Sequence, residues 1–149
     1  MINPFFKNTG PHDINYLLKT INLKNESLSE DKIIDIKDLN SSQKNEITFF
    51  HSKKYAEFAK KTKASYCLTS ENFKSFLPNT CKPIISNKVL LHTAEITKIF
   101  YPDSITDNYD NTVKNIEATS LRDKVSFGKN VLIGENVEIG SNCLIGHNS

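Results

Sequence analysis

Four histidines supply the side chains best suited to general acid–base chemistry near neutral pH. They are His12, His51, His92 and His147. None of them has an Asp, Cys or Ser partner at a spacing that predicts a catalytic pair. The histidines therefore do not identify an active site by themselves.

The cysteines are the second group that could carry chemistry. Cys67, Cys81 and Cys143 are odd in number and show no CxxC spacing. They indicate reduced packing residues, as in a cytoplasmic protein, rather than a disulfide framework or a zinc site.

A cluster of lysines could bind anions. Its members are Lys53, Lys54, Lys60, Lys61 and Lys63. One interpretation is that one or two of them contact a nucleotide diphosphate or an acidic protein surface. The other, which we favour, is that they form the solvated face of a helix opposite Phe58 and Ala59.

The charge balance of the 149-residue chain excludes a strong electrostatic field. Lys and Arg number 19 and Asp and Glu number 17, for a net charge of +2. Arg122 is the single arginine, whereas proteins that read DNA bases use arginine for bidentate contacts, so we expect no nucleic-acid partner. The sequence contains no leader-like start and no apolar run long enough to span a membrane, which favours a cytoplasmic location.

The elements that must position these side chains begin with a repeat near the C-terminus. Four glycines recur every six residues, and an asparagine follows each of them by two residues: Gly128, Gly134, Gly140 and Gly146. A six-residue period is typical of a β-helix. We expect short strands ending in tight turns, where Gly and Asn adopt a positive φ. A run of unrelated hairpins is the alternative.

The phase of the repeat predicts which side chains point inward. Phe127, Ile133, Ile139 and Ile145 form one inward row, and Val131, Val137 and Cys143 fill the next inward position. His147 lies at a turn position, where Glu135 and Ser141 are its equivalents, and is expected to face solvent rather than act as a base. A weaker unit begins at Leu121. The repeat stops within a unit at Ser149, so we expect a truncated β-helix from a longer protein.

Upstream of the repeat, the pattern alternates between short strands and helices. Helical spacing predicts helices over Asp13–Ile21, with Pro11 at its start, over Lys53–Thr62, and from the cap Asn87 to Tyr101. Strands are predicted at Lys32–Ile36, Glu46–Phe50, Ser65–Thr69 and Lys82–Ser86. The organisation is an α/β domain over residues 1–102, a polar linker over 103–118 and the start of the β-helix over 119–149.

A resemblance to a known family rests on two stretches of this domain. They are Asp35–Leu39 and Glu46–Tyr55, supported by Phe5–Phe6, Gly10–Pro11 and Ile99–Pro102. With the repeat that follows, they resemble the N-terminal portion of the UDP-3-O-acylglucosamine N-acyltransferases of lipid A synthesis. The fold that this implies is an α/β domain followed by a left-handed parallel β-helix of hexapeptide repeats.

The resemblance also implies an activity. Such an enzyme moves a 3-hydroxyacyl group from acyl carrier protein to the 2-amine of UDP-3-O-acyl-glucosamine, with a histidine as general base and backbone donors for the oxyanion. The family is homotrimeric, with active sites between neighbouring β-helices. No metal and no cofactor are implied. The family's catalytic histidine lies beyond Ser149, so the resemblance assigns no catalytic residue here.

The resemblance assigns a uracil-binding site to three residues. Phe49 and Tyr55 match the two aromatic rings that sandwich the base, and Ser52 matches the polar residue between them, where the family commonly has Asn. Lys53 replaces the common Pro. The alternative is that Phe49 is a core strand residue and Tyr55 a helix anchor.

Three functions remain open from the sequence. They are the lipid A N-acyltransferase, another sugar-nucleotide acyltransferase or acetyltransferase, and a non-enzymatic nucleotide-binding or trimerisation module. The sequence beyond Ser149 would separate them. We expect the chain as given to lack acyl-transfer activity and to form no firm trimer.

Overall fold

A computed structural model describes residues 6–23, 29–104 and 110–149. The chain divides into two compact units, Met1–Thr106 and Asp107–Ser149. Each unit is described by itself below. Phe5, which contributes to the family resemblance, lies outside the described residues.

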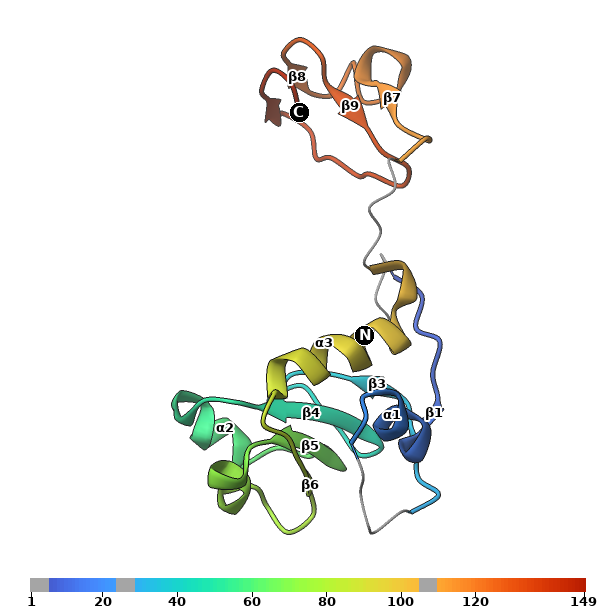
Figure 1. Cartoon of the computed structure of the whole chain (residues 1–149). Helices are drawn as coiled ribbons and strands as arrows, with labels where there is room; N and C mark the ends of the chain where they lie inside the picture. Colours follow the sequence, from blue (N-terminus) through green and yellow to red (C-terminus); the bar gives the residue numbers. More distant parts are fainter. Residues whose placement is uncertain (1–5, 24–28, 105–109) are drawn as a thin grey trace. The chain divides into compact units, whose positions relative to one another are not determined.

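A parallel sheet organises the first unit. Its strands β3 (Asp35–Ile36), β4 (Glu46–Phe50), β5 (Tyr66–Thr69) and β6 (Lys82–Ile85) lie side by side in chain order (Figure 1). Successive side chains of β4 and β5 point to opposite faces of the sheet. Nearly all of them are buried, so both faces of these strands are covered, and each face carries apolar residues.

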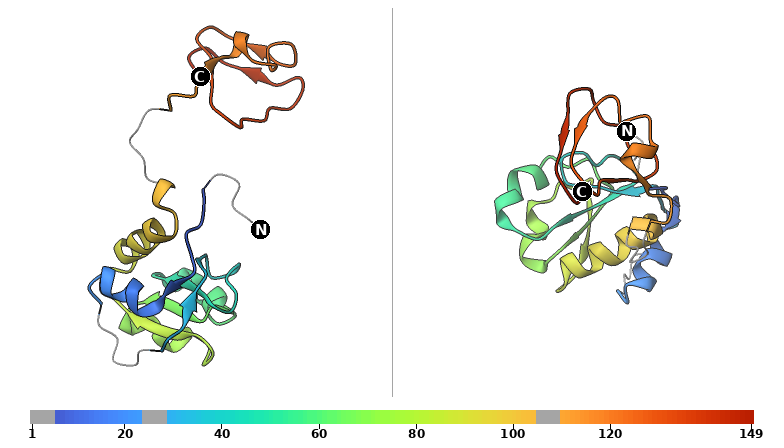
Figure 2. Two further views of the ribbon diagram at one scale, coloured as in Figure 1. Left: turned by 90° about the vertical axis from the view of Figure 1, so that its right-hand side faces the viewer. Right: turned by 90° about the horizontal axis from the view of Figure 1, so that it is seen from above.

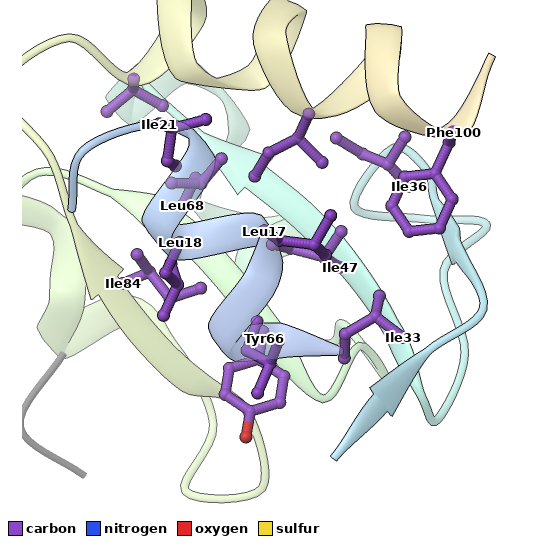
Figure 3. Packing of buried hydrophobic residues seen from close by; sticks show 13 residues of the cluster. Leu17, Leu18, Ile21, Ile33, Ile36, Ile47, Tyr66, Leu68, Ile84 and Phe100 are labelled. Atoms are coloured by element: carbon purple, nitrogen blue, oxygen red, sulfur yellow. The ribbon is translucent and has the colours of Figure 1, made fainter. Parts of the chain in front are cut away.

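Helices α1 (Ile14–Thr20) and α3 (Val89–Phe100) cover one face of this sheet (Figures 1 and 2). Leu17 of α1, Leu68 of β5 and Phe100 of α3 are fully buried in the core between these layers (Figure 3). Asp13 caps α1, since its carboxylate accepts a hydrogen bond of 2.8 Å from the Asn15 N–H. The helix predicted for this segment is thus confirmed.

The opposite face carries shorter helical segments. They are η1 (Lys53–Tyr55), α2 (Ala56–Ala59) and η2 (Glu71–Phe76). Ala56 and Ala59 pack there against Phe50 and Cys67. Cys67 and Cys81 are free and buried, and the hydrogen bond with Cys81, together with burial, raises the pKa of the Cys67 thiol.

The helix predicted over Lys53–Thr62, with Tyr55, Phe58, Ala59 and Thr62 on one side, is wrong in its length and in the burial of that side. The α-helical part ends at Ala59, and the buried residues are Ala56, Ala59 and Thr62, whereas Tyr55 is 39% exposed and Phe58 is 50% exposed. After α2 the chain tightens into i→i−3 hydrogen bonds, and the Thr62 hydroxyl lies 3.2 Å from the Ser42 hydroxyl.

Two further boundaries differ from the prediction. The strand at Lys32–Ile36 divides into β2 (Lys32–Ile33), which pairs antiparallel with β1 (His12–Asp13), and β3. The division falls at Ile34, whose N–H donates a hydrogen bond of 2.8 Å to the Asn45 carbonyl. Pro11 precedes β1 and does not begin α1.

The cap of α3 also differs from the prediction. Lys88 rather than Asn87 is the N-cap residue, and its side chain makes no capping hydrogen bond. The Ser86 hydroxyl instead accepts a hydrogen bond from the Lys88 N–H at 2.9 Å. The helix ends before Pro102, as predicted, and a short 3-10 turn, η3 (Pro102–Ser104), follows it.

The second unit consists of short strands and turns. It contains β7 (Lys114–Asn115), η4 (Ile116–Ala118), β8 (Ser126–Phe127), β9 (Leu132–Ile133) and β10 (Leu144–Ile145). Residues 114–118 were expected in the linker, yet they form β7 and η4, and Ile116 is buried at 1% exposure. Residues 105–109 of that expected linker lie outside the described residues.

Strands β8 and β10 pair in parallel, with Leu144 opposite Ser126 and Ile145 opposite Phe127. The partners are 18 residues apart, which is three six-residue units. Strand β7 pairs antiparallel with β9 instead. The offset between β8 and β10 is therefore a whole multiple of the six-residue period of the sequence.

The turns assign different roles to Asn and Gly. Asn130, Asn136, Asn142 and Asn148 all have φ between 55° and 62°, in the left-handed region. Among the described glycines none has a positive φ, so that part of the prediction is wrong. Gly128 is required by space instead, because a Cβ there would lie 2.8 Å from the backbone nitrogen of His147.

The inward rows of the repeat are only partly as predicted. Phe127, Ile133, Ile139 and Ile145 are half-buried and pack around the small core of Ile116, Val125 and Val131. Val137 is 45% exposed and Cys143 is exposed, which corrects the prediction for these two residues. Val125, which directly precedes Ser126, is buried, whereas Cys143, which directly precedes the paired Leu144, is exposed.

Candidate functional site

A pocket of about 410 Å³ opens where β3 and β4 end. The carboxyl end of a parallel sheet is where α/β proteins commonly bind ligands. The pocket is lined by Asp38, Leu39, Asn40, Phe49, His51, Tyr55 and Phe58. Its volume lies within the range typical of small-molecule sites.

Three rings stand together on the β4 side of the pocket. The ring centroids of Phe49 and His51 are 6.2 Å apart with an interplanar angle of 23°, and those of His51 and Tyr55 are 5.9 Å apart. Phe49 is half-buried against the core, because β4 directs it to the same face as Ile47. The Lys54 ammonium lies 5.9 Å from the Tyr55 ring centroid. The arrangement offers flat apolar surface for stacking on a planar ligand.

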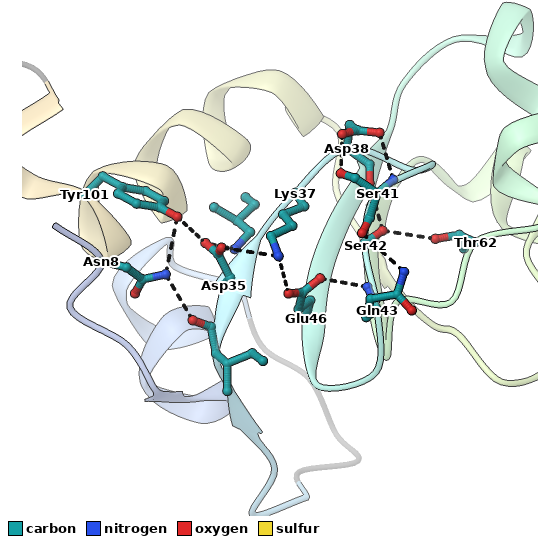
Figure 4. Close-up of polar contacts among 12 residues, drawn as sticks. Asn8, Asp35, Lys37, Asp38, Ser41, Ser42, Gln43, Glu46, Thr62 and Tyr101 are labelled. Carbon is teal, nitrogen blue, oxygen red and sulfur yellow. Dashed lines mark hydrogen bonds and ion pairs between the residues drawn. The ribbon is translucent and has the colours of Figure 1, made fainter. Parts of the chain in front are cut away.

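A tight turn after β3 also lines the pocket. The Asp38 carboxylate accepts hydrogen bonds from the Ser41 hydroxyl and from the backbone N–H groups of Asn40, at 2.8 Å, and Ser41, at 3.1 Å. The hydrogen bond from the Ser41 side chain is the main cause that lowers the pKa of Asp38. Asp38 therefore stays ionised at neutral pH and holds the turn in place (Figure 4).

Buried Glu46 supports this turn from below. Its carboxylate contacts the Lys37 ammonium at 2.6 Å and accepts a hydrogen bond from the Gln43 N–H at 2.7 Å. The Lys37 ammonium also lies 3.7 Å from Asp35. These carboxylates raise the pKa of Lys37, chiefly through the hydrogen bond to Glu46. The network in Figure 4 thus fixes the pocket wall to the edge of the sheet.

The structure brings together two of the three residues predicted for uracil binding. Phe49 and Tyr55 line the pocket, whereas Ser52 is not among its lining residues. Ser52 precedes η1, and its carbonyl accepts a hydrogen bond from the Tyr55 N–H at 3.0 Å. The sequence-based prediction did not include the turn at Asp38 and Asn40. This turn follows a predicted strand, and the ends of parallel strands are where α/β proteins commonly bind ligands, so its place could have indicated it.

The other histidines lie outside this pocket. The imidazole of exposed His147 accepts a hydrogen bond from the Lys129 N–H at 2.8 Å, and His12 contacts the Phe100 ring edge-on at 5.0 Å. His92 is buried, and its Nδ1 lies 2.9 Å from the Ser86 hydroxyl. The sequence analysis missed this pair. It is a structural contact at the start of α3, where Ser86 also receives the Lys88 N–H.

The lysine cluster lies on the exposed side of η1, α2 and the turn that follows. Its members are exposed, and Lys60 pairs with Glu57 at 2.7 Å. Within residues 6–23, 29–104 and 110–149, no group of three or more His, Cys, Asp or Glu side chains is placed to hold a metal ion. No helix in the described part of the chain is long and apolar enough to cross a membrane.

Comparison with known proteins connects this pocket to a family. Residues 32–99 match the family model described as UDP-3-O-(3-hydroxymyristoyl) glucosamine N-acyltransferase, LpxD. The matched segment contains the whole sheet and every residue that lines the pocket. The predicted family resemblance is confirmed.

Curated relatives agree with the family match. UDP-3-O-acylglucosamine N-acyltransferase of Rickettsia canadensis is 36% identical over 80 residues, which is 51% of this chain and 23% of that protein. The same-named protein of Rickettsia massiliae is 37% identical over 93 residues, which is 60% of this chain and 25% of that protein. That of Rickettsia prowazekii is 33% identical over 91 residues, or 59% and 24%. The matched part therefore spans about a quarter of the length of these relatives.

Proposed function

We propose that the pocket binds the uracil of a UDP-linked sugar. The observation that carries this proposal is the coincidence of pocket and family match, since residues 32–99 include both aromatic rings and the turn that faces them. The relatives are named for a UDP-linked substrate. A planar base stacks well on Phe49 and Tyr55, because stacking buries apolar area without requiring a charge.

We further propose that the whole protein is an N-acyltransferase of lipid A biosynthesis. Its relatives are named for acyl transfer to UDP-3-O-acylglucosamine. The acyl donor expected from the resemblance is acyl carrier protein with a 3-hydroxyacyl chain, and the acceptor is the 2-amine. The amine attacks the thioester carbonyl, loses a proton to a general base and releases the carrier thiol. We assign no described side chain to that step.

The second unit supports a further part of the proposal, a left-handed parallel β-helix of hexapeptide repeats. Two observations support it: the 18-residue offset between β8 and β10, and the four asparagines with positive φ at six-residue intervals. In this proposal the β-helices assemble a cytoplasmic homotrimer, as the resemblance implies.

Titration of the chain with UDP, followed by NMR, tests the proposed pocket. We expect chemical-shift changes at Phe49, Tyr55 and their neighbours at millimolar UDP or below. Tyr55→Ala should cost about 1 to 3 kcal/mol of binding free energy, the range for loss of one base-stacking ring. Tyr55 is a cleaner choice than half-buried Phe49, whose removal also disturbs the core.

The matched control for Tyr55→Ala is Tyr16→Ala. Tyr16 is also an exposed tyrosine, at 51%, but it lies on α1 and outside the pocket. It should leave UDP binding unchanged. Equal affinity of wild type and Tyr55→Ala, or no binding by the wild type, would place the uracil site elsewhere.

A further inference from the structure

His51 is placed to contact a ligand in the pocket, although the resemblance assigns the polar role to Ser52. It is the first residue after β4, and its exposed side chain lines the pocket between two ring contacts. We infer that His51 is the residue that hydrogen-bonds the base held by Phe49 and Tyr55. The inference rests on the proposed function, because it requires uracil in this pocket.

The local geometry favours His51 over Ser52. The His51 ring lies 6.2 Å from the Phe49 ring and 5.9 Å from the Tyr55 ring, centroid to centroid. A base that contacts both aromatic rings therefore comes within reach of the imidazole. Ser52 is absent from the lining, and its backbone begins η1. A serine hydroxyl also has a shorter reach than the amide of the asparagine that is common in the family.

The imidazole has unused hydrogen-bonding capacity. Its nitrogens make no hydrogen bond to any residue in the described part of the chain, and its recorded contacts are the two ring contacts. A neutral imidazole carries one N–H donor and one nitrogen acceptor. The rim of uracil presents two carbonyl oxygens and an N–H between them, so either nitrogen of His51 finds a complementary partner.

The other polar groups of the pocket are less suited to this role. The Asp38 carboxylate already accepts hydrogen bonds from Ser41 and Asn40, which hold the turn. Asn40 also lines the pocket, but among the described contacts nothing places its amide beside the Phe49 or Tyr55 ring. The Lys54 ammonium lies against the Tyr55 ring, outside the group of lining residues.

Binding of uridine and of UDP to the whole 149-residue chain tests the inference. His51→Phe keeps a ring but removes both polar nitrogens, and it should weaken both ligands equally, by about threefold to tenfold, as for one lost hydrogen bond. His51→Gln keeps a donor and an acceptor, and it should stay closer to wild type than His51→Phe. Ser52→Ala and Asn40→Ala are the comparison variants and should change binding by less than about twofold, since neither residue forms the assigned contact.

The outcomes separate this inference from the proposed function. Wild-type affinity of His51→Phe, with weakened binding by Tyr55→Ala, would overturn the role of His51 and leave the uracil site standing. A loss confined to UDP would mean that His51 contacts phosphate, which also overturns the inference. A larger loss in Ser52→Ala or Asn40→Ala than in His51→Phe would transfer the role to that residue. If wild type bound neither ligand, both the inference and the proposed function would fail.

Discussion

Tyr101 shows how one hydroxyl group can make stability depend on pH. The hydroxyl donates a hydrogen bond of 2.7 Å to Asp35 and accepts one of 3.3 Å from the Asn8 amide (Figure 4). Burial, reinforced by the hydrogen bond to Asp35, raises the pKa of Tyr101 to about 12. The neutral phenol is therefore the form that the fold stabilises.

We expect the first unit to lose stability between pH 10.0 and about 12, the ordinary and the raised pKa of Tyr101. In this window the unfolded chain has released the phenol proton while the folded chain still holds it, so rising pH favours unfolding. The loss should amount to about 1 to 2 kcal/mol, because the hydroxyl is only partly buried and solvent screens its interactions. Urea unfolding followed at pH values across this window measures it.

Tyr101→Phe is the matched variant for this test, because it keeps the ring and removes the titrating group. Its stability should fall less over the same window. A smaller decline remains from Lys37, whose pKa is raised by Glu46, since its ion pair is also lost at high pH. Identical pH profiles for wild type and variant would show that the Tyr101 hydroxyl does not contribute.

At the residue scale, the structure brings together the two aromatic residues that were predicted to bind uracil. Phe49 and Tyr55 line one pocket, since their places follow from the end of a strand and the start of a helix, and their contact with uracil stays a prediction. Ser52 does not line the pocket. Its position depends on the backbone dihedrals at the start of η1, which the family spacing does not specify.

At the element scale, Gly128 is the glycine of the repeat that is most sensitive to added volume. A Cβ at this residue would lie 2.8 Å from the backbone nitrogen and Nδ1 of His147 and 3.0 Å from the carbonyl carbon of Gly146. Backbone atoms cannot turn aside as a flexible side chain can. We expect Gly128→Ala to destabilise the second unit by about 1 to 3 kcal/mol, the range for overpacking.

The control for this substitution is Gly140→Ala, at the equivalent position two units later. A Cβ there would meet no atom within 4 Å, so the stability of the second unit should change little. Hydrogen exchange of amides in β8 and β10 reports the effect locally. Comparable exchange rates in the two variants would contradict the close packing of Gly128 against residues 146 and 147.

Strands were easier to predict from the sequence than helix ends. The bounds of β4 agree with the prediction, because alternation and β-branched or aromatic residues identify a strand locally. The end of α2 was not predicted, and the segment after it contacts Ser42 through Thr62, 20 residues away. The division of the strand at Ile34 is likewise accompanied by a contact with Asn45. Long-range hydrogen bonds of this kind leave no periodic signal.

At the scale of the whole molecule, we expect the two units to unfold in separate transitions. Each unit has its own hydrophobic core. The first unit contains two large clusters, and the second contains the small core of Ile116, Val125 and Val131. A 43-residue unit with so small a core is marginally stable. The second unit should therefore unfold at lower urea concentration than the first.

NMR peak intensities measured through a urea titration test this prediction. Leu68 and Ile47 report on the first unit, and Val131 and Val125 report on the second. Coincident midpoints for all four residues would mean that the units unfold as one cooperative body.

The division into two units was more predictable than its boundary. The change from alternating elements to a six-residue repeat is visible in the sequence, and the structure divides the chain between residues 106 and 107. The places of β7 and η4 were not predictable, because Lys114–Asn115 pairs antiparallel with β9 and does not follow the repeat. The pairing with β9 and the burial of Ile116 show that this segment belongs to the second unit.

In the proposed β-helix, the 18-residue offset between β8 and β10 would be one full coil and would limit how the repeat can change length during evolution. An insertion of six residues would preserve the alternation of inward and outward side chains, yet it would move each later strand of that β-helix beside a different predecessor. An insertion or deletion of 18 residues preserves both the side-chain phase and the strand neighbours. Homologues should therefore differ in length within this region in steps of 18 residues, and gaps of other lengths should fall at the turns as bulging loops.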